Sequence, residues 1–293
     1  MADDLNDYYK DYNYGGRKPI YIKEEELRTD QLDRLIKSDV FCIIPWIHMH
    51  AFPDGRAYPC CLSEPQHPIG NLNQQSMKEV WNEQPMRDMR KNMMNEQPCK
   101  ECTKCYEQEK SKLFSMRESS NKNFGHHVGL VDETKDDGTF EDFKLRYYDI
   151  RFSNLCNLRC RSCGHIFSSQ WYQDQAKLAG SEWKLHNSVL NYAGRTESDM
   201  WEQLEPHLDY VEQIYFAGGE PLVIEEHYQL LEEMIRQGRT DIKLIYNTKD
   251  LGTKHQASGN KFAISEWNKV VEYRFHSEST SCCILSFRFE PNS

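Results

Sequence analysis

The sequence predicts an α/β protein whose C-terminal half is built on a parallel β-sheet. After residue 145, short apolar segments alternate with longer amphipathic ones, which is the pattern of repeated strand and helix units. Cysteines and glycines follow directly after two of these apolar segments. In sheets of this kind the chemistry lies at the carboxyl ends of the strands, so we expect a functional site there.

The C-terminal elements are predicted from periodicity and length. We expect strands over Tyr147–Phe152, Gln213–Ala217, Lys243–Tyr246 and Val270–Phe275. We expect helices over Ser168–Ala179, Glu226–Gln237 and Phe262–Asn268.

The N-terminal half is predicted to be a separate Cys-rich unit. Residues 1–22 form a tail without an apolar period, and Leu27, Leu32, Leu35 and Ile36 fit one face of a helix over Glu24–Ser38. A second helical stretch, Ser76–Met94, begins with a capping box of Ser76 and Glu79. Its expected inward residues are Met77, Val80, Trp81, Met86 and Met89. The predicted division is a tail and helix (1–38), a Cys-rich unit (39–112), a linker (113–144), a core domain (145–275) and a C-terminal tail (276–293), in which Ile284–Phe289 is one further strand candidate.

Composition excludes several classes of protein. With 36 Lys and Arg against 46 Asp and Glu, the formal net charge is −10, which argues against binding to nucleic acid or to an anionic membrane through the overall field. The chain has no apolar run of the ~18 residues that a membrane span needs. The acidic N-terminus lacks the features of a secretory signal, so we expect a cytoplasmic protein. In that reducing compartment the 11 cysteines are expected to be ligands and not disulfides.

Three cysteines follow the first predicted strand with the spacing CxxxCxxC: Cys156, Cys160 and Cys163. A cubic 4Fe–4S cluster normally takes four thiolates, so three would leave one iron open to another ligand. A zinc site is the alternative, although zinc loops usually repeat the shorter C-x2-C spacing.

This motif resembles that of the radical SAM superfamily, in which the open iron binds S-adenosylmethionine. The resemblance extends to the segment after the second predicted strand, where Gly218, Gly219, Glu220 and Pro221 match the GGEP motif that receives the methionyl amine of the cofactor. It also implies a cofactor or substrate contact by Asn247, in the pair Asn247–Thr248 after the third strand. The chain departs from the pattern at Ser162, where the superfamily commonly has an aromatic residue beside the adenine.

The N-terminal cysteines resemble the SPASM and Twitch auxiliary-cluster domains. Cys42, Gly55 and Cys60 fit the signature C-x(9–15)-G-x4-C, and a C-x2-C pair, Cys99 and Cys102, follows. The resemblance implies a second, auxiliary 4Fe–4S cluster held by Cys42, Cys60, Cys99 and Cys102, with Cys61 and Cys105 as alternate ligands. A zinc knuckle built from the same thiolates is the alternative. The histidines His48, His50, His126 and His127 are expected to be ordinary polar residues and not ligands.

Together these resemblances imply a partial (β/α) barrel of radical SAM type, preceded by a small Cys-rich Twitch/SPASM-like α+β domain. The superfamily barrel usually has six strand–helix units, whereas we count four strands here, so the barrel is expected to be truncated. The implied function is reductive cleavage of S-adenosylmethionine to a radical that abstracts hydrogen from a peptide, a carbohydrate or a small metabolite. The implied partner is a flavodoxin- or ferredoxin-type electron donor, and no catalytic residue is assigned beyond the cluster. The competing hypothesis is a non-catalytic iron–sulfur or zinc-binding protein with an incomplete barrel.

Overall fold

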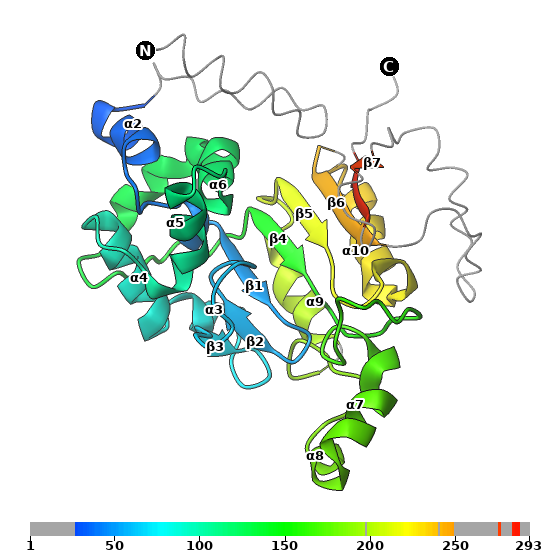
Figure 1. Cartoon of the computed structure of the whole chain (residues 1–293). Coiled ribbons are helices and arrows are strands. Elements are labelled where there is room, and N and C mark those ends of the chain that lie inside the picture. The colour runs from blue at the N-terminus through cyan, green and yellow to red at the C-terminus, as the bar shows by residue number, and fades with distance from the viewer. Residues whose placement is uncertain (1–26, 197, 240, 249–274, 277–282, 288–293) are drawn as a thin grey trace.

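The computed structural model describes residues 27–196, 198–239, 241–248, 275–276 and 283–287, whose strands form one open, mixed β-sheet (Figure 1). The strand order is β3-β2-β1-β4-β5-β6-β8-β7. The strands are β1 (His48–Ala51), β2 (Arg56–Tyr58), β3 (Gly70–Asn71), β4 (Tyr147–Ile150), β5 (Gln213–Phe216), β6 (Lys243–Thr248), β7 (Phe275–His276) and β8 (Cys283–Phe287).

The centre of the sheet is parallel, as the sequence predicts. Strands β1, β4, β5 and β6 run in one direction, and antiparallel pairs extend the sheet at both edges. The α/β class and the strands expected near 147, 213, 243 and 284 are confirmed. The predicted helix Phe262–Asn268 and nearly all of the predicted strand Val270–Phe275 lie outside the described residues. Because the described strands form an open sheet, a radical SAM barrel stays a prediction.

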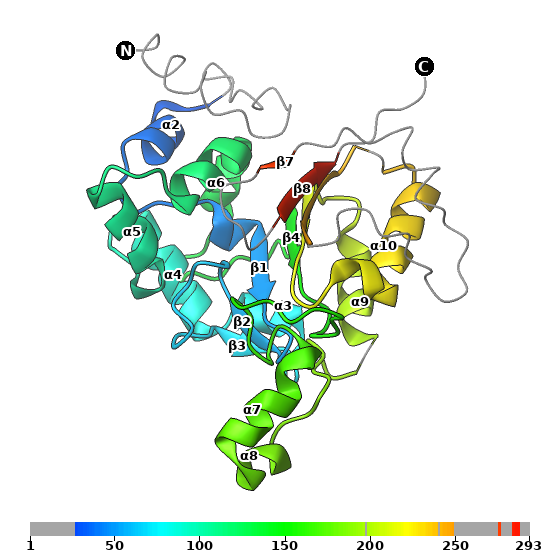
Figure 2. The ribbon, with the colours of Figure 1, turned by 45° about the vertical axis from the view of Figure 1, so that its right-hand side comes forward.

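Helices surround this sheet unevenly. Helices α2, α4, α5 and α6 gather beside β1, α9 and α10 lie on one face of the sheet, and α7 and α8 project away from it (Figure 2). Among the described helices, none combines the length and apolarity required to cross a membrane. The α-helices are α2 (Thr29–Ile36), α3 (Met77–Trp81), α4 (Gln84–Met94), α5 (Thr103–Lys110), α6 (Met116–Phe124), α7 (Tyr172–Ala179), α8 (Ser181–Leu185), α9 (Asp199–Leu204) and α10 (Glu225–Arg236). The 3₁₀ helices are η2 (Ile44–Trp46), η3 (Lys100–Cys102), η4 (Gly125–Glu133), η5 (Ser169–Trp171), η6 (Glu205–His207) and η7 (Pro221–Val223).

The helix expected over Ser76–Met94 is two helices, α3 and α4. The predicted capping box is confirmed, because Ser76 Oγ accepts from Glu79 N and the Glu79 carboxylate accepts from Ser76 N. The break comes before Pro85, which lacks an N–H and fits the first turn of a helix but not its interior. The five residues predicted to point inward are all buried.

The first helix is shorter than predicted within the described residues, and its buried face agrees with the prediction at Leu35 but not at Ile36. Its inward residues are Gln31 and Leu35, whereas Ile36, predicted to lie on the buried face, is 46% exposed. Gln31 is held there by Asp132 of η4, whose carboxylate accepts a hydrogen bond from the Gln31 side chain at 2.9 Å. A tertiary hydrogen bond therefore allows the polar Gln31 to lie on the buried face of α2 beside Leu35.

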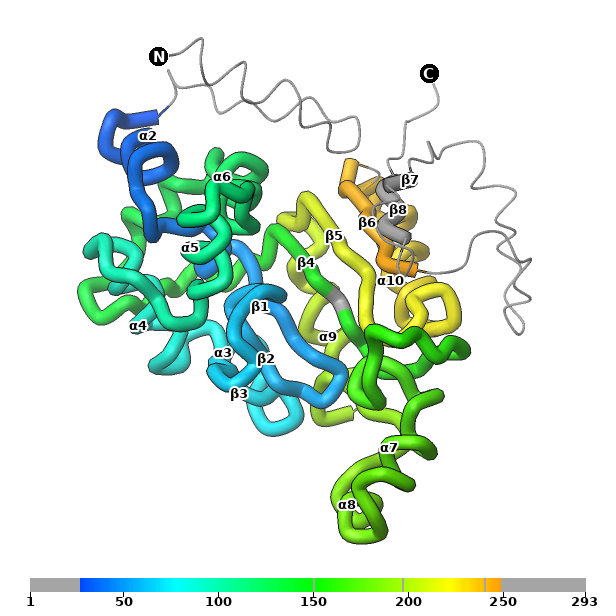
Figure 3. Tube along the Cα trace, in the orientation of Figure 1, coloured from blue at the N-terminus to red at the C-terminus, as the bar shows by residue number. Residues whose placement is uncertain are grey.

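One apolar core runs through both halves of the chain. It joins Trp46 and Trp81 from the Cys-rich half to Phe216 and Tyr246 from the parallel strands. The segment 113–144, expected to be a linker, contains α6 and η4 and contributes to this core; its buried apolar side chains include Phe124, Val128, Val131 and Phe140. Figure 3 shows the path of this segment, which follows α5 and leads back to the centre of the sheet at β4.

Two fully buried histidines lie in or against this sheet. His48 Nδ1 donates to Tyr147 O at 2.8 Å and the ring stacks on that of Tyr147, while His227 Nε2 is hydrogen-bonded to the Tyr246 hydroxyl. Burial lowers the pKa of His48 from 6.5 to about 4 and that of His227 to about 3. Both imidazoles are therefore neutral in the folded protein at pH 7.

This burial predicts a loss of stability in mild acid. Below pH 6.5 these histidines bind protons in the unfolded chain but stay neutral in the folded protein. The free energy of unfolding therefore decreases as the pH drops from 6.5 to about 4. For His48 the loss amounts to roughly 3 kcal/mol at 1.36 kcal/mol per pKa unit. Urea unfolding at pH 7 and pH 4 should show a smaller loss in His48→Gln than in the parent. The control is the exposed His186→Gln, and an equal loss in all three proteins would contradict the account.

Candidate functional site

The CxxxCxxC cysteines lie on the loop that leaves the carboxyl end of β4. Cys156 is buried, and Cys160 and Cys163 are partly exposed. The loop is held by its own hydrogen bonds: Cys156 Sγ accepts from Leu158 N at 3.3 Å, and Cys160 O accepts from Cys163 N and from Trp171 Nε1. The loop is therefore a defined structure in which one thiol lies inside the protein and two face outward.

Asn154 closes this loop, and the sequence analysis missed it. Its side chain is fully buried; Nδ2 donates to His165 O at 2.8 Å and to Val189 O, and Oδ1 accepts from Asn191 N. These bonds join the start of the cysteine loop to its end and to the segment before α9. A lone asparagine two residues before a cysteine carries no sequence signal strong enough to reveal this role.

The GGEP segment lies directly against the cysteine loop. Gly219 N donates to Phe167 O at 3.0 Å, and Glu220 N donates to Leu155 O at 2.9 Å. Gly219 has φ +63°, and a Cβ there would lie 2.3 Å from Leu155 O. Gly218 has φ +71°, and a Cβ there would lie 2.8 Å from the Arg151 side chain. Both glycines are thus required by the approach of two loops that are some sixty residues apart in the chain.

Glu220 is buried and fixed from two sides. Its carboxylate accepts from Thr248 Oγ1 at 2.6 Å and from Leu222 N at 3.3 Å, and Pro221 opens the short helix η7 that follows. Thr248 is the last residue of β6, so the Glu220 carboxylate links the GGEP segment to the carboxyl end of β6. Asn247 also lies at this strand end, one residue before Thr248; neighbouring side chains on a strand point to opposite faces.

A second group of thiols lines a pocket in the Cys-rich half. Four cysteines from three segments, Cys42, Cys60, Cys102 and Cys105, face it together with three methionines. The methionines are Met89, Met93 and Met116. The other lining residues are the charged Glu101 and Arg117 and the apolar Ile44, Pro45, Pro59 and Leu62. An apolar pocket with four thiols suits a thiolate-bound metal cluster, because soft thiolate ligands select such groups.

Of the six N-terminal cysteines, two lie outside this lining. Cys99 is buried and points at the backbone, with Sγ 3.7 Å from Met89 O, although it also contacts Cys102. Cys61 does not line the pocket, and its thiol interacts electrostatically with Asp149 and Arg151. The pocket lining therefore includes Cys105, predicted as an alternate ligand, and does not include Cys99.

The buried thiols of Cys42, Cys60, Cys105 and Cys156 are protonated at neutral pH when no metal is bound. Burial raises the pKa of Cys60 to about 11 and that of Cys105 to about 12, and it raises the pKa of Cys42 well above its usual range. Burial, with a contribution from the Glu220 charge, also raises the pKa of Cys156. A metal group bound at either site would have to displace these protons.

A buried polar group lies between the two sites. His50 on β1 and Asp149 on β4 are opposite each other in the sheet, with His50 Nδ1 3.0 Å from the Asp149 carboxylate and both side chains almost fully buried. Arg151 Nε donates to the same carboxylate at 3.3 Å. Burial opposes the charge, but His50 and Arg151 outweigh it and lower the pKa of Asp149. An acid in the middle of the apolar segment YYDI is a signal that the sequence analysis did not use.

Comparison with known families supports the N-terminal assignment. A family model of an iron–sulfur cluster-binding domain, SPASM, matches residues 42–106. The match begins at Cys42 and includes all six N-terminal cysteines, so the resemblance to an auxiliary-cluster domain is confirmed over this segment. No curated protein and no solved structure is similar enough to the chain to match it. The radical SAM core and the individual ligands stay predictions.

The contact at Gly219 predicts a selective effect of a single methyl group. Gly219→Ala should push the cysteine loop away, because Leu155 O occupies the place of the new Cβ. Gly238→Ala is the matched control: it has the similar φ of +71° but nothing within 4 Å of the added Cβ. We expect a cost of about 1 to 2 kcal/mol for Gly238→Ala, from the left-handed backbone, and a larger one for Gly219→Ala. Thermal unfolding and iron per chain measure this, and equal values for the two variants would contradict the contact.

The pocket lining predicts which cysteines hold the auxiliary group. In a chain with Cys156, Cys160 and Cys163 changed to Ala, all bound iron is auxiliary. In that background Cys105→Ala should lose most of the iron and Cys61→Ala should keep it. Cys99→Ala should keep more iron than Cys105→Ala, because Cys99 does not line the pocket. Iron and sulfide analysis would reject this ligand set if Cys99→Ala were the more depleted protein.

Proposed function

We propose that this chain is a radical SAM enzyme with an auxiliary iron–sulfur cluster. One observation carries the proposal: the GGEP segment and the CxxxCxxC loop are hydrogen-bonded to each other at the carboxyl edge of the parallel strands. Each motif alone is a weak signal, since a GGEP turn and a three-cysteine loop both have structural explanations. Their contact across about sixty residues of chain, in the sheet that also holds the SPASM match, supports a shared cofactor.

In this proposal Cys156, Cys160 and Cys163 hold a 4Fe–4S cluster with one open iron. Bound there, the reduced cluster would supply the electron that splits S-adenosylmethionine into methionine and a 5′-deoxyadenosyl radical. That chemistry would remove a hydrogen atom from the substrate, with 5′-deoxyadenosine as the other product. The electron comes from a flavodoxin- or ferredoxin-type donor, and the substrate is a peptide, a carbohydrate or a small metabolite.

The chain's own groups would bind and orient the cofactor. Gly218 and Gly219 let the GGEP segment pack directly against Arg151 and Leu155, since a Cβ at either position would clash with them, and this packing holds the segment beside the cysteine loop. Glu220 is fixed by Thr248 and Leu222, so its carboxylate can accept hydrogen bonds from an ammonium group in a constant position. We assign Asn247, at the end of β6, a contact with the cofactor or substrate.

The auxiliary cluster would occupy the pocket of Cys42, Cys60 and Cys102, with Cys105 as the fourth ligand. It would relay an electron or seat the substrate. The spacing of the thiols favours a cluster over zinc. Tetrahedral zinc with Zn–S bonds of ~2.3 Å brings its sulfurs to about 3.8 Å from one another. Among the described residues, no three thiols have their sulfur atoms all within 4.8 Å of one another, which is wider than the spacing around zinc. A 4Fe–4S cube binds each thiolate to a different iron and so accepts a wider spacing.

The test is formation of 5′-deoxyadenosine by anaerobically reconstituted, dithionite-reduced protein with S-adenosylmethionine. We expect product from the parent and from Ser162→Ala, whose side chain is not a ligand. We expect only background product from Cys160→Ala, whose iron content should fall by about half because one of two cubes is lost.

Two results would reject the proposal. Equal iron in Cys160→Ala and in the parent would show that the ligand assignment is wrong. Absence of product from a parent protein with full iron and sulfide would favour the non-catalytic cluster-binding protein instead.

A further inference from the structure

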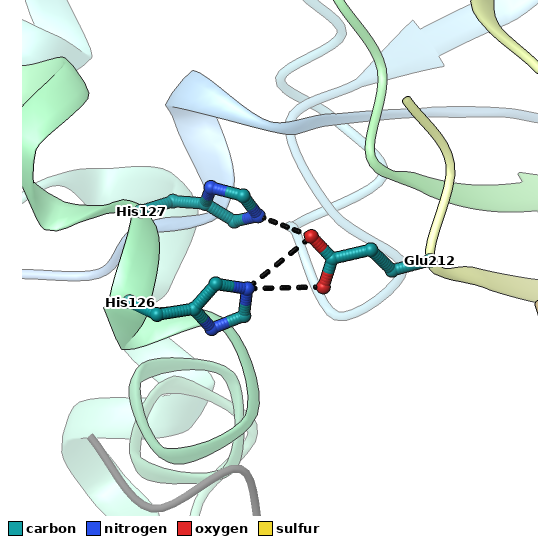
Figure 4. Close-up of side chains that lie close together, drawn as sticks. All are labelled: His126, His127 and Glu212. Carbon is teal, nitrogen blue, oxygen red and sulfur yellow. Dashed lines mark hydrogen bonds and ion pairs between the residues drawn. The ribbon is translucent and has the colours of Figure 1, made fainter. Parts of the chain in front are cut away.

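A third group of potential ligands lies at the other end of the parallel strands. His126 and His127 on η4 both direct Nε2 at the carboxylate of Glu212, the residue before β5 (Figure 4). The Nε2 to oxygen distances are 3.0 and 3.2 Å for His126 and 2.6 Å for His127. The GGEP segment follows the carboxyl end of β5, so this group is separated from the CxxxCxxC site by the length of that strand.

The arrangement is held by the backbone on both sides. Glu212 N donates to Arg146 O, and Glu212 O accepts from Lys243 N, so its backbone is fixed between β4 and β6. On η4 the following residues Val128 and Val131 are buried in the core and anchor the two histidines. The three side chains therefore converge from rigid elements some 85 residues apart in the chain.

We propose that His126, His127 and Glu212 form a binding site for a divalent transition-metal ion, with Zn²⁺ as its simplest occupant. Two imidazoles and one carboxylate are a known ligand set for zinc with an open fourth position. All three donor atoms lie within 4.8 Å of one another. Zinc bonds of ~2.0 to 2.1 Å place tetrahedral donors about 3.3 Å apart, so the present Nε2 to oxygen contacts need to open by about 0.1 to 0.7 Å.

Access and tautomer both suit this role. The side chains of His126, His127 and Glu212 are 27%, 17% and 25% exposed, which leaves room for a water as the fourth ligand. His126 Nδ1 is buried and has no hydrogen-bond partner among the described residues. In the metal-free site Nε2 carries the proton that it donates to Glu212. Because Nδ1 has no partner, the proton can move to Nδ1 when a metal takes the Nε2 lone pair.

The neighbouring charges do not prevent binding. Arg146 and Arg239 act electrostatically on His127 and Glu212 respectively. Each guanidinium has its own carboxylate partner, Asp142 for Arg146 and Asp241 for Arg239. A bound ion would link η4 to the central sheet and so stabilise the fold. Because it would lie at the other end of β5 from the CxxxCxxC site, it would take no part in the radical reaction.

The experiment compares zinc binding in matched variants of the full chain. The cluster-loaded protein is treated with EDTA, equilibrated with Zn²⁺, desalted and analysed for zinc, alongside Glu212→Gln, His127→Ala and the control Glu202→Gln. We expect the parent and Glu202→Gln to hold about one equivalent of zinc more than Glu212→Gln and His127→Ala. Zinc should bind at least tenfold more weakly to these two site variants. Zinc should raise the Tm of the parent and of Glu202→Gln but not that of the site variants.

Glu212→Gln retains the size of the side chain and a hydrogen-bonding oxygen, so the variant should fold. Zinc held by cysteines would be the same in every variant and cancels in the comparison, so the result does not depend on the proposed radical chemistry. Equal zinc in Glu212→Gln and the parent would place the ion elsewhere. No zinc-dependent difference at all would show that these contacts are ion pairs only, and either result overturns the proposal.

Discussion

The parallel pairing of β1 with β4 is the constraint on which the rest of the structure depends. It sets His48, Met49 and His50 opposite Tyr147, Tyr148 and Asp149, and it makes one sheet out of the Cys-rich half and the strands that follow. Strand β2 runs back antiparallel to β1, so Cys60 returns toward the amino end of β1, whereas Cys156 follows the carboxyl end of β4. A change of register by one residue would turn every side chain of β1 to the other face and separate His50 from Asp149.

This pairing determines what lies between the two cysteine sites. His50, Asp149 and Arg151 form a buried charged group at the junction, and Arg151 also packs on Gly218 of the GGEP segment. A buried carboxylate is tolerated only where it is paired, and here His50 comes from β1 and Arg151 directly follows β4. In the proposed enzyme this group separates the auxiliary cluster from the cofactor, so its charge contributes to the field that both experience. The SPASM-matched segment is thus part of the same folded unit as the candidate active site.

The local features of the fold could be predicted from sequence because they depend on neighbouring residues. The strands after residue 145, the capping box at Ser76 and the five inward residues of α3 and α4 all follow from periodicity and cap chemistry. The features that escaped depend on residues far apart in the chain. Asp132 pairs with the buried Gln31 of α2, Asn154 closes the cysteine loop through Asn191, and Thr248 fixes Glu220. The segment 113–144 looked like a linker because it is polar, yet a few apolar residues, Phe124 and Val128 among them, suffice to anchor it.

The central claim is that the CxxxCxxC loop and the GGEP segment hold one cofactor between them. Its most direct test is the EPR spectrum of the reduced protein with and without S-adenosylmethionine, in a Cys42→Ala, Cys60→Ala variant so that the auxiliary signal does not interfere. The account predicts that S-adenosylmethionine changes the spectrum in this protein and that adding Gly219→Ala weakens or abolishes the change. A spectrum that is the same with and without S-adenosylmethionine, from protein with full iron and sulfide at the three remaining ligands, would contradict it.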